Sequence, residues 1–163
     1  MEFERLRLPE EARIREMSEM ATEIVREHFD PLIGKAQNDY MIGKFQTFDA
    51  IREQLRHGYL YYFVLEEGRR IGFLAFYPKE SCLYLSKFYL YKEERGKGYS
   101  RSMCDFVVQK AREAGLSAVE LNVNRSNSAV YAYEKLGFRL VRTEKNDIGE
   151  GYFMDDFVYR LDV

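Results

Sequence analysis

The spacing of apolar residues changes from a helical to a strand period near residue 59, and this change constrains the fold more than any other feature. Before it, apolar side chains recur every three or four positions from Ile14 to Val25, which predicts a helix over about 9–27. After it, residues 59–65 and 71–77 are rich in aromatic and β-branched side chains on either side of a turn, which predicts a hairpin. The chain therefore combines helices with a sheet.

The rest of the chain shows the same two periods in a definite order. Predicted strands cover 3–8, 82–90, 119–123, 138–145 and 153–161, predicted helices cover 49–56, 99–114 and 127–136, and the loop-like stretch 28–47 ends in a short helix at 39–45. This order predicts an α/β (α+β) fold. A length of 163 residues suits a single domain over 1–163, and no repeat or linker divides it.

Composition argues against several classes of protein. The chain holds 46% hydrophobic and 32% charged residues with a net charge of −2, and no basic block favours nucleic-acid binding. No apolar run approaches the ~20 residues of a membrane span, and the charged start lacks a signal peptide's apolar centre, so we expect a cytoplasmic protein with no membrane partner. Because Cys82, Cys104, His28 and His57 form no cluster, we expect reduced cysteines and no metal site.

The most informative chemical feature is the junction between strand 82–90 and the helix that follows. It reads Arg95, Gly96, Lys97, Gly98, Tyr99, Ser100 and Arg101. Two glycines let the backbone turn tightly, a helix N-terminus offers unpaired N–H groups, and three basic side chains add positive charge. These properties favour a pyrophosphate site, with an ordinary glycine-containing turn as the alternative. Neither a P-loop nor a complete dinucleotide-binding fingerprint is present.

A second motif, Asn127 to Phe138, follows the first in the order that GNAT-superfamily N-acetyltransferases show. The junction resembles their pyrophosphate motif [Q/R]-x-x-G-x-[G/A], with Ser100 where glycine or alanine is usual. The second motif is similar to N-x-x-A-x-x-x-Y-E-K-x-G-F, with the alanine shifted by one residue to Ala129. The resemblance covers roughly 59–161. It implies a mixed, mostly antiparallel central sheet of about six to seven strands flanked by about four helices.

The resemblance also implies a reaction, in which acetyl-CoA is the co-substrate and an amine attacks its thioester directly. In that scheme the pantetheine arm binds the backbone of the strand end formed by Phe88, Tyr89 and Leu90, and a backbone N–H there polarises the thioester carbonyl. The pyrophosphate binds the glycine-containing junction. Asn127 either caps the helix that begins there or bonds the pantetheine.

Tyr133 matches the family's general acid and its contact with the co-substrate. A phenol with a pKa near 10 can donate a proton to the leaving thiolate. The alternative for Tyr133 is a core aromatic of an amphipathic helix. Tyr131 lies two positions earlier on a different helix face, where a structural role is expected.

The general base is the main departure from the family. Many members carry glutamate at the position of Asn122, and an amide cannot accept a proton at neutral pH. Glu120 shares the strand parity of Asn122 and is one candidate, although a solvent-facing charge is the simpler interpretation; water-relayed deprotonation oriented by Asn122 is another. Asp155 and Asp156 point to opposite faces of a strand, so at most one of them would place negative charge near the amine.

Several functions remain open from the sequence. The acceptor is a small amine such as a polyamine, or a peptide, and the strings 38–41 and 147–156 resemble those of bacterial GNAT proteins, some described as polyamine acetyltransferases. Tyr40, Phe45 and Phe48 either line the acceptor site or belong to the core. A homodimer is compatible with the sequence. The alternatives are a non-catalytic acyl-CoA-binding module, which the missing glutamate favours, and a phosphate-ligand sensor.

Overall fold

The computed structural model describes residues 1–163, which form two compact units. Unit 1 comprises residues 1–77 and 87–99, and unit 2 comprises residues 78–86 and 100–163. The strands follow the order β1-β2-β3-β4-β5-β7-β6, and β4 (Cys82–Leu90) contributes residues to both units. The pairs β1–β2, β2–β3, β5–β7 and β6–β7 are antiparallel, and the pair β4–β5 is parallel. This mixed sheet, with five α-helices, confirms the predicted fold class.

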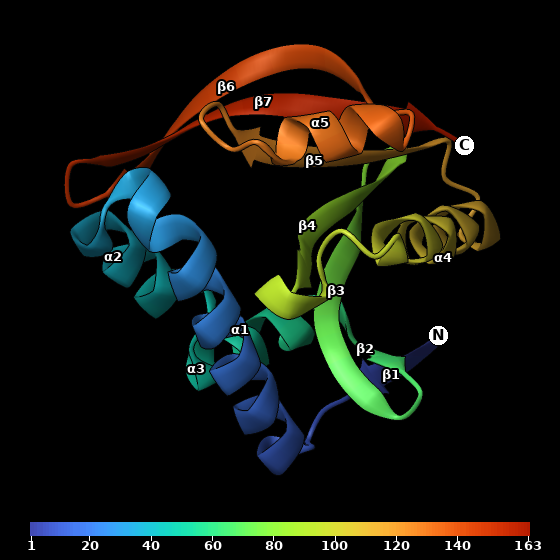
Figure 1. Cartoon of the computed structure of the whole chain (residues 1–163), viewed down its shortest axis with the longest axis horizontal. Helices are drawn as coiled ribbons and strands as arrows, with labels where there is room; N and C mark the ends of the chain where they lie inside the picture. The colour runs from blue at the N-terminus through green and yellow to red at the C-terminus, as the bar shows by residue number, and fades with distance from the viewer. The chain divides into compact units, whose positions relative to one another are not determined.

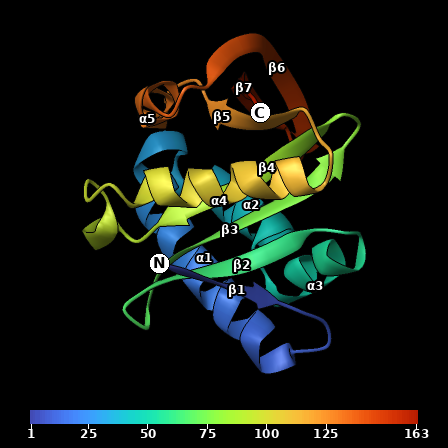
Figure 2. The ribbon, with the colours of Figure 1, turned by 90° about the vertical axis from the view of Figure 1, so that its right-hand side faces the viewer.

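Unit 1 places three helices on one face of antiparallel strands (Figures 1 and 2). Its elements are β1 (Glu2–Leu6), α1 (Glu11–Ile33), α2 (Lys35–Phe45), α3 (Phe48–Arg56), β2 (Leu60–Glu66), β3 (Arg69–Lys79), the second half of β4, and a short 3-10 helix, η1 (Lys92–Glu94). The predicted hairpin is present as β2 and β3. Glu67 and Gly68 at its tip both have positive φ, as a tight two-residue turn requires.

The core of unit 1 lies between α1 and strands β2 and β3. Its buried side chains come from positions spaced by three and four along α1 and from alternate positions on the strands, as the two apolar periods predicted. They are Leu6, Ile14, Met17, Met20, Ala21, Ile24, Ile51, Tyr61, Phe63, Leu65, Phe73 and Ala75.

The loop predicted over residues 28–38 is wrong, because α1 continues to Ile33 and α2 begins at Lys35. Pro31 lies inside α1, where it removes one backbone donor without ending the helix. Buried Asn38 of α2 donates to the Val25 carbonyl (3.2 Å) and to Asp30 Oδ1 (2.7 Å). These contacts hold the last turns of α1 in place, and Gly34, with φ of 87°, provides the break between the helices.

Unit 2 contains the first half of β4, α4 (Tyr99–Glu113), β5 (Ala118–Asn124), α5 (Ala129–Lys135), β6 (Arg139–Gly149) and β7 (Tyr152–Asp162). Strand β7 pairs with both β5 and β6. Helix α5 lies against β7 (Figure 1), where Tyr159 Oη donates to Glu134 Oε1 at 2.8 Å and Leu161 lies beside Gly137. Because side chains alternate along a strand, the even-numbered residues of β7 point away from α5. None of the chain's helices combines the length and apolar character needed to cross a membrane.

Candidate functional site

The glycine loop, Arg95 to Gly98, has the backbone that the sequence predicted. Gly96 and Gly98 have φ of 78° and 84°, and α4 begins directly afterwards at Tyr99. A Cβ atom built on either glycine would meet no heavy atom within 4 Å. The glycines are therefore required by the left-handed backbone and not by packing, and open space surrounds them. A ligand can approach this backbone closely.

The basic side chains of the junction already have partners. Arg95 donates to Glu27 Oε2 of α1 (2.8 Å) and to the Leu90 carbonyl (3.1 Å), and Lys97 contacts Glu94 Oε2 (3.3 Å). Glu94 is buried and also binds Arg69, and that hydrogen bond holds its pKa below the usual range. Two of the predicted positive charges are thus balanced by carboxylates, which leaves the backbone N–H groups as the main anion-binding resource of the loop.

Strand β4 approaches β3 closely at the residues predicted to bind the pantetheine. A Cβ on Gly72 of β3 would lie 2.1 Å from the Tyr89 carbonyl oxygen, so only glycine permits this contact. The Tyr89 ring packs beside Phe73, with centroids 5.5 Å apart. Tyr89, between Phe88 and Leu90, therefore lies close to β3 through both its carbonyl and its ring.

The second motif forms α5 and the turn before it. The helix starts two residues later than predicted, and its N-cap is Ser128, not Asn127. Buried Asn127 lies one residue earlier and accepts a hydrogen bond from the Ala129 N–H at 3.0 Å, which closes the turn before the helix. Tyr133 is half-buried, with its ring edge-on to Phe138 at 5.7 Å. Tyr131 is 68% exposed, so it has no place in the core.

The two motifs meet within unit 2. Arg101, in the first turn of α4, donates from Nη2 to the Lys135 carbonyl at the end of α5, at 3.0 Å. Tyr133 lies on that helix, two residues before Lys135. The start of α4 is thus bonded to the end of the helix that carries Tyr133.

Asn122 lies at the centre of a network that the sequence did not reveal. Its Oδ1 accepts from Tyr84 Oη (2.8 Å), and its Nδ2 donates to Glu144 Oε2 (3.1 Å) and Asp156 Oδ2 (3.3 Å). Asp156 is only 2% exposed, and burial raises its pKa. Its neighbour Asp155 is half-exposed and paired with Arg125, so the two point to opposite faces as predicted. No local pattern marks this network, because its members come from four strands.

The interpretation of Glu120 as a solvent-facing charge is wrong. Glu120 is 9% exposed, and its two oxygens accept from Arg142 Nη2 (3.0 Å) and Arg160 Nη1 (2.9 Å). Arg160 lies on β7, which pairs with β5, and Arg142 lies on β6, which pairs with the other edge of β7. One guanidinium group is therefore bound to each oxygen of Glu120, and an acceptor amine would have to compete with both arginines to reach them.

Lys87 is a buried charge that the sequence analysis missed. Its Nζ donates to the Phe45 carbonyl (2.7 Å), Gln46 Oε1 (2.8 Å) and Gln54 Oε1 (3.2 Å), and it lies over the Tyr61 ring. Burial lowers its pKa to about 7. The available signal was a single lysine in the middle of an otherwise apolar strand.

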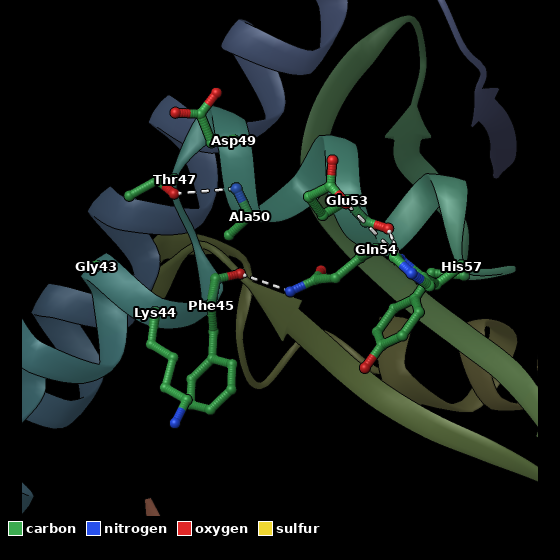
Figure 3. Close-up of a pocket in the computed structure, with 10 residues that line it drawn as sticks. Gly43, Lys44, Phe45, Thr47, Asp49, Ala50, Glu53, Gln54 and His57 are labelled. Carbon is green, nitrogen blue, oxygen red and sulfur yellow. Dashed lines mark hydrogen bonds and ion pairs between the residues drawn. The ribbon is translucent and has the colours of Figure 1, made fainter. Parts of the chain in front are cut away.

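An open hollow of about 810 Å³ lies over the α2–α3 connection in unit 1 (Figure 3). Phe45 and Gln54 line it and are joined by a hydrogen bond from Gln54 Nε2 to the Phe45 carbonyl. Its carboxylates are paired on α3 itself, Asp49 with Arg52 and Glu53 with Arg56. The predicted role of Phe45 beside a hollow is therefore compatible with the structure, whereas Phe48 packs against the core of unit 1.

Metal ligands are not clustered in this chain. No group of three or more His, Cys, Asp or Glu side chains is arranged to hold a metal ion. Cys82 and Cys104 are unpaired and buried, and burial raises the pKa of both thiols. The expectation of metal-independent function stays a prediction.

Comparison with solved structures shows the same fold in known acetyltransferases. The PaiA N-acetyltransferase of Thermoplasma acidophilum, solved with coenzyme A, superimposes with a TM-score of 0.78 at 18% identity, covering 100% of both chains. A Bacillus subtilis acetyltransferase solved with CoA gives a TM-score of 0.61 at 17% identity, covering 89% of this chain and 91% of that one. The ribosomal-protein-alanine N-acetyltransferase of Brucella melitensis gives 0.68 at 16% identity, covering 100% of both chains. At these identities the likeness concerns the fold.

Sequence comparison adds family membership. The chain is 32% identical over 96 residues to the uncharacterized N-acetyltransferase YdgE of Bacillus subtilis (strain 168); the match covers 55% of this chain and 59% of that protein's length. The family model of the acetyltransferase (GNAT) domain matches residues 30–152, a range that contains both motifs, Asn122 and Lys87. The chain therefore belongs to the GNAT family of acetyltransferases.

Proposed function

We propose that this chain transfers the acetyl group of acetyl-CoA to a primary amine by direct attack of the amine on the thioester. The observation that carries the proposal is the glycine loop, whose left-handed Gly96 and Gly98 lead into the N-terminus of α4 with open space around them. Unpaired backbone N–H groups at a helix start suit a pyrophosphate. The family membership and the CoA bound to two proteins of the same fold support acetyl-CoA as the ligand.

In the proposed complex, residues of this chain bind and orient while acetyl-CoA supplies the activated acetyl group. The backbone from Arg95 to Ser100 binds the pyrophosphate, and the backbone of Phe88 to Leu90 binds the pantetheine arm and polarises the thioester carbonyl. Gly72 supports this role, because it fixes the Tyr89 carbonyl by close contact. Asn127 holds the start of α5 or contacts the pantetheine.

Tyr133 is the proposed proton donor to the leaving thiolate. Its position on α5 is fixed by the Phe138 ring and by the bond from Arg101 to the Lys135 carbonyl. Glu120 is not part of this scheme, since two arginines occupy its oxygens. The acceptor is a small amine such as a polyamine, or a peptide amine; a solved relative of the same fold is named a ribosomal-protein-alanine N-acetyltransferase, so peptides belong among the acceptors tested.

Release of free thiol from acetyl-CoA in the presence of an amine panel tests the proposal. The panel contains a polyamine, a free amino acid, a peptide with a free N-terminus and a lysine peptide whose N-terminus is blocked. We expect thiol release with at least one amine and none without amine, before and after treatment with a metal chelator. Size measurement of the same sample decides whether a homodimer forms.

One observation favours a second function. Asn122 stands where many family members carry their catalytic glutamate, as a non-catalytic acyl-CoA-binding module would allow. Calorimetric binding of CoA without thiol release from any amine would support the binding module and contradict the enzyme. Binding of ATP or NAD in preference to CoA would instead support a phosphate-ligand sensor.

A further inference from the structure

A primary ammonium with a pKa of about 10.4 must lose a proton before it can attack a thioester. The side chain at the family's glutamate position, Asn122, cannot accept that proton. Its amide nitrogen does, however, donate to two carboxylates, Glu144 at 3.1 Å and Asp156 at 3.3 Å. Asn122 therefore holds carboxylates close to the place where the family has one of its own.

The two carboxylates differ in how their charge is balanced. Glu144 accepts from Arg142 at 3.0 Å and from the amides of Asn122 and Asn146, and the Asn122 bond helps to hold its pKa below the usual range. Asp156 accepts only from Asn122, and no arginine or lysine donates to it. A buried carboxylate without a cation has a higher proton affinity than one in an ion pair. Asp156 is thus the better proton acceptor of the two.

The same comparison excludes the other carboxylates of this region. Glu120 is bound by Arg142 and Arg160, and Asp155 is half-exposed and bound by Arg125 at 2.5 Å. Among the acidic side chains of the network, only Asp156 is both buried and without a cationic partner.

Strand geometry separates Asp156 from the proposed acid. Odd-numbered residues of β7 face α5, the helix of Tyr133, since Tyr159 binds Glu134 and Leu161 lies beside Gly137. Asp156 points to the opposite face of β7, toward Asn122. Asp156 and Tyr133 therefore lie on different faces of β7 and do not hydrogen-bond to each other.

We propose that Asp156, held by Asn122, is the general base that takes the proton from the acceptor ammonium. This inference rests on the proposed acetyl transfer. An N–H bond of the ammonium breaks and an O–H bond forms on Asp156, which later releases this proton to solvent. The amine lone pair then forms the C–N bond as the C–S bond breaks. Tyr133 gives its phenol proton to the thiolate of CoA. The nitrogen then loses a second proton, which returns to the Tyr133 oxygen.

The environment of Asp156 sets the expected pH dependence. Tyr84 from β4, Asn122 from β5, Glu144 from β6, Asp155 from β7 and Arg125 after β5 are the polar and charged groups around it. Burial raises the pKa of Asp156 most, Glu144 and Asp155 raise it further, and the Asn122 bond and Arg125 lower it. Activity is therefore expected to fall as pH drops through an Asp156 pKa that lies above the ordinary aspartate range.

The decisive variant is Asp156→Asn, which keeps the size of the side chain and removes its basicity. We expect kcat/KM for the amine to fall by about 10²–10⁴-fold, with loss of the acidic limb of the pH profile and unchanged calorimetric affinity for CoA. Asp156→Glu should restore part of the rate and shift the acidic limb, which a purely structural role would not produce. The matched control Asp155→Asn should change kcat/KM by less than about twofold.

The outcomes separate this inference from the proposed function. A wild-type protein that binds CoA and acetylates no amine refutes both. An active wild type whose Asp156→Asn variant keeps its rate and its acidic limb refutes the role of Asp156 alone. If Asp156→Asn fails to fold, the Asp156→Glu profile decides: an acidic limb identical to that of the wild type overturns the inference.

Discussion

The glycine loop and the strands around Asn122 both hold several charged side chains, and they balance these charges in different ways. In the loop, Lys97 pairs with Glu94 three residues away, and both Arg95 and its partner Glu27 are about a third exposed. Around Asn122, the buried carboxylate of Glu120 is bound by arginines of two other strands, while no arginine or lysine is bonded to Asp156. Exposed pairs contribute little to stability, whereas buried charges are costly when a partner is missing.

The glycine loop and the strand network are therefore expected to have different roles. Arg95 of the loop can exchange its partly exposed partner Glu27 for a phosphate ligand at small cost, whereas Glu94, the partner of Lys97, is buried. In the strand network, Asp156 is buried with no arginine or lysine bonded to it, and burial raises its pKa; perturbed groups of this kind are common at catalytic sites. The loop is therefore expected to govern ligand affinity, and the network to govern protein stability and proton transfer.

Among the residues of the glycine loop and the second motif, Tyr133 is expected to show the largest loss of activity when its hydroxyl is removed. Tyr133→Phe keeps the ring contact with Phe138 and deletes the proton donor. We expect kcat to fall by about 10²–10⁴-fold with little change in KM for acetyl-CoA, because the loss is confined to the transition state. Steady-state kinetics with an acceptor found in the amine panel measures this.

The control for that experiment is Tyr131→Phe, since Tyr131 is mostly exposed on the same short helix. It should be nearly neutral. A Tyr133→Phe enzyme with wild-type kcat would remove Tyr133 from the mechanism and leave it as a packing residue.

Glu120→Gln tests how much the buried ion pairs of the strand network contribute to stability. The substitution keeps the size of the side chain but leaves Arg142 and Arg160 without a shared carboxylate. We expect the free energy of unfolding to fall by about 1–3 kcal/mol, below the cost of breaking a fully buried pair, because both arginines are partly exposed and keep Glu144 and Asp162 as partners. Urea unfolding measures the change.

The matched exposed pair is Glu16 with Arg70. Glu16→Gln should lower the unfolding free energy by less than about 1 kcal/mol. Equal losses for Glu16→Gln and Glu120→Gln would contradict the distinction between exposed and buried pairs.

Gly98→Val tests the loop as a ligand site. Gly98 has φ of 84°, and a β-branched residue there is strained by roughly 1–2 kcal/mol. Relief of that strain would move the backbone N–H groups, so we expect CoA affinity measured by calorimetry to fall about tenfold or more. Gly115→Val, with φ of 71° just after α4, carries comparable strain away from the loop and should leave CoA affinity unchanged. Similar affinity losses in both variants would show that strain, and not the loop, weakens binding.

Sequence patterns identified the elements whose signals are local. Strand periods, the Glu67–Gly68 turn and the glycine loop depend on residues close together in the chain, and the structure contains each of them. The end of α1 was misplaced because Asp30-Pro31 is a strong local turn signal, which Asn38 of α2 overrides through tertiary contacts.

The sequence could not identify the partners of Asn122, because these contacts also depend on tertiary structure. Asn122 meets Glu144 and Asp156 only after β5, β7 and β6 pair in their observed register. Glu120 looked like a surface charge because the arginines that cover it lie 22 and 40 residues away. A site assembled by strand pairing has no spacing that a single sequence can show.

Lys87 completes the comparison as a buried cation without a carboxylate, and it is expected to give the smallest effect. Its pKa is about 7 in the folded protein and near the ordinary 10.5 when unfolded. Between these pH values the unfolded chain holds a proton that the folded chain has lost, so stability rises with pH across that window. Below pH 7 both states are protonated, and the cost of burying the ammonium is present in full. In Lys87→Met this dependence disappears.

The wild type should therefore gain stability relative to Lys87→Met between pH 7 and pH 9, by less than about 1.4 kcal/mol per pH unit. The gain stays below that limit because three acceptors surround Nζ, which suits the three N–H groups of an ammonium and opposes the effect of burial. Urea unfolding of both proteins at the two pH values measures the difference. Lys110→Met, on an exposed ion pair of α4, should follow the wild-type curve. If Lys87→Met follows it as well, Lys87 keeps its proton throughout this range, and its neutral partners stabilise a buried charge as well as the arginines stabilise Glu120.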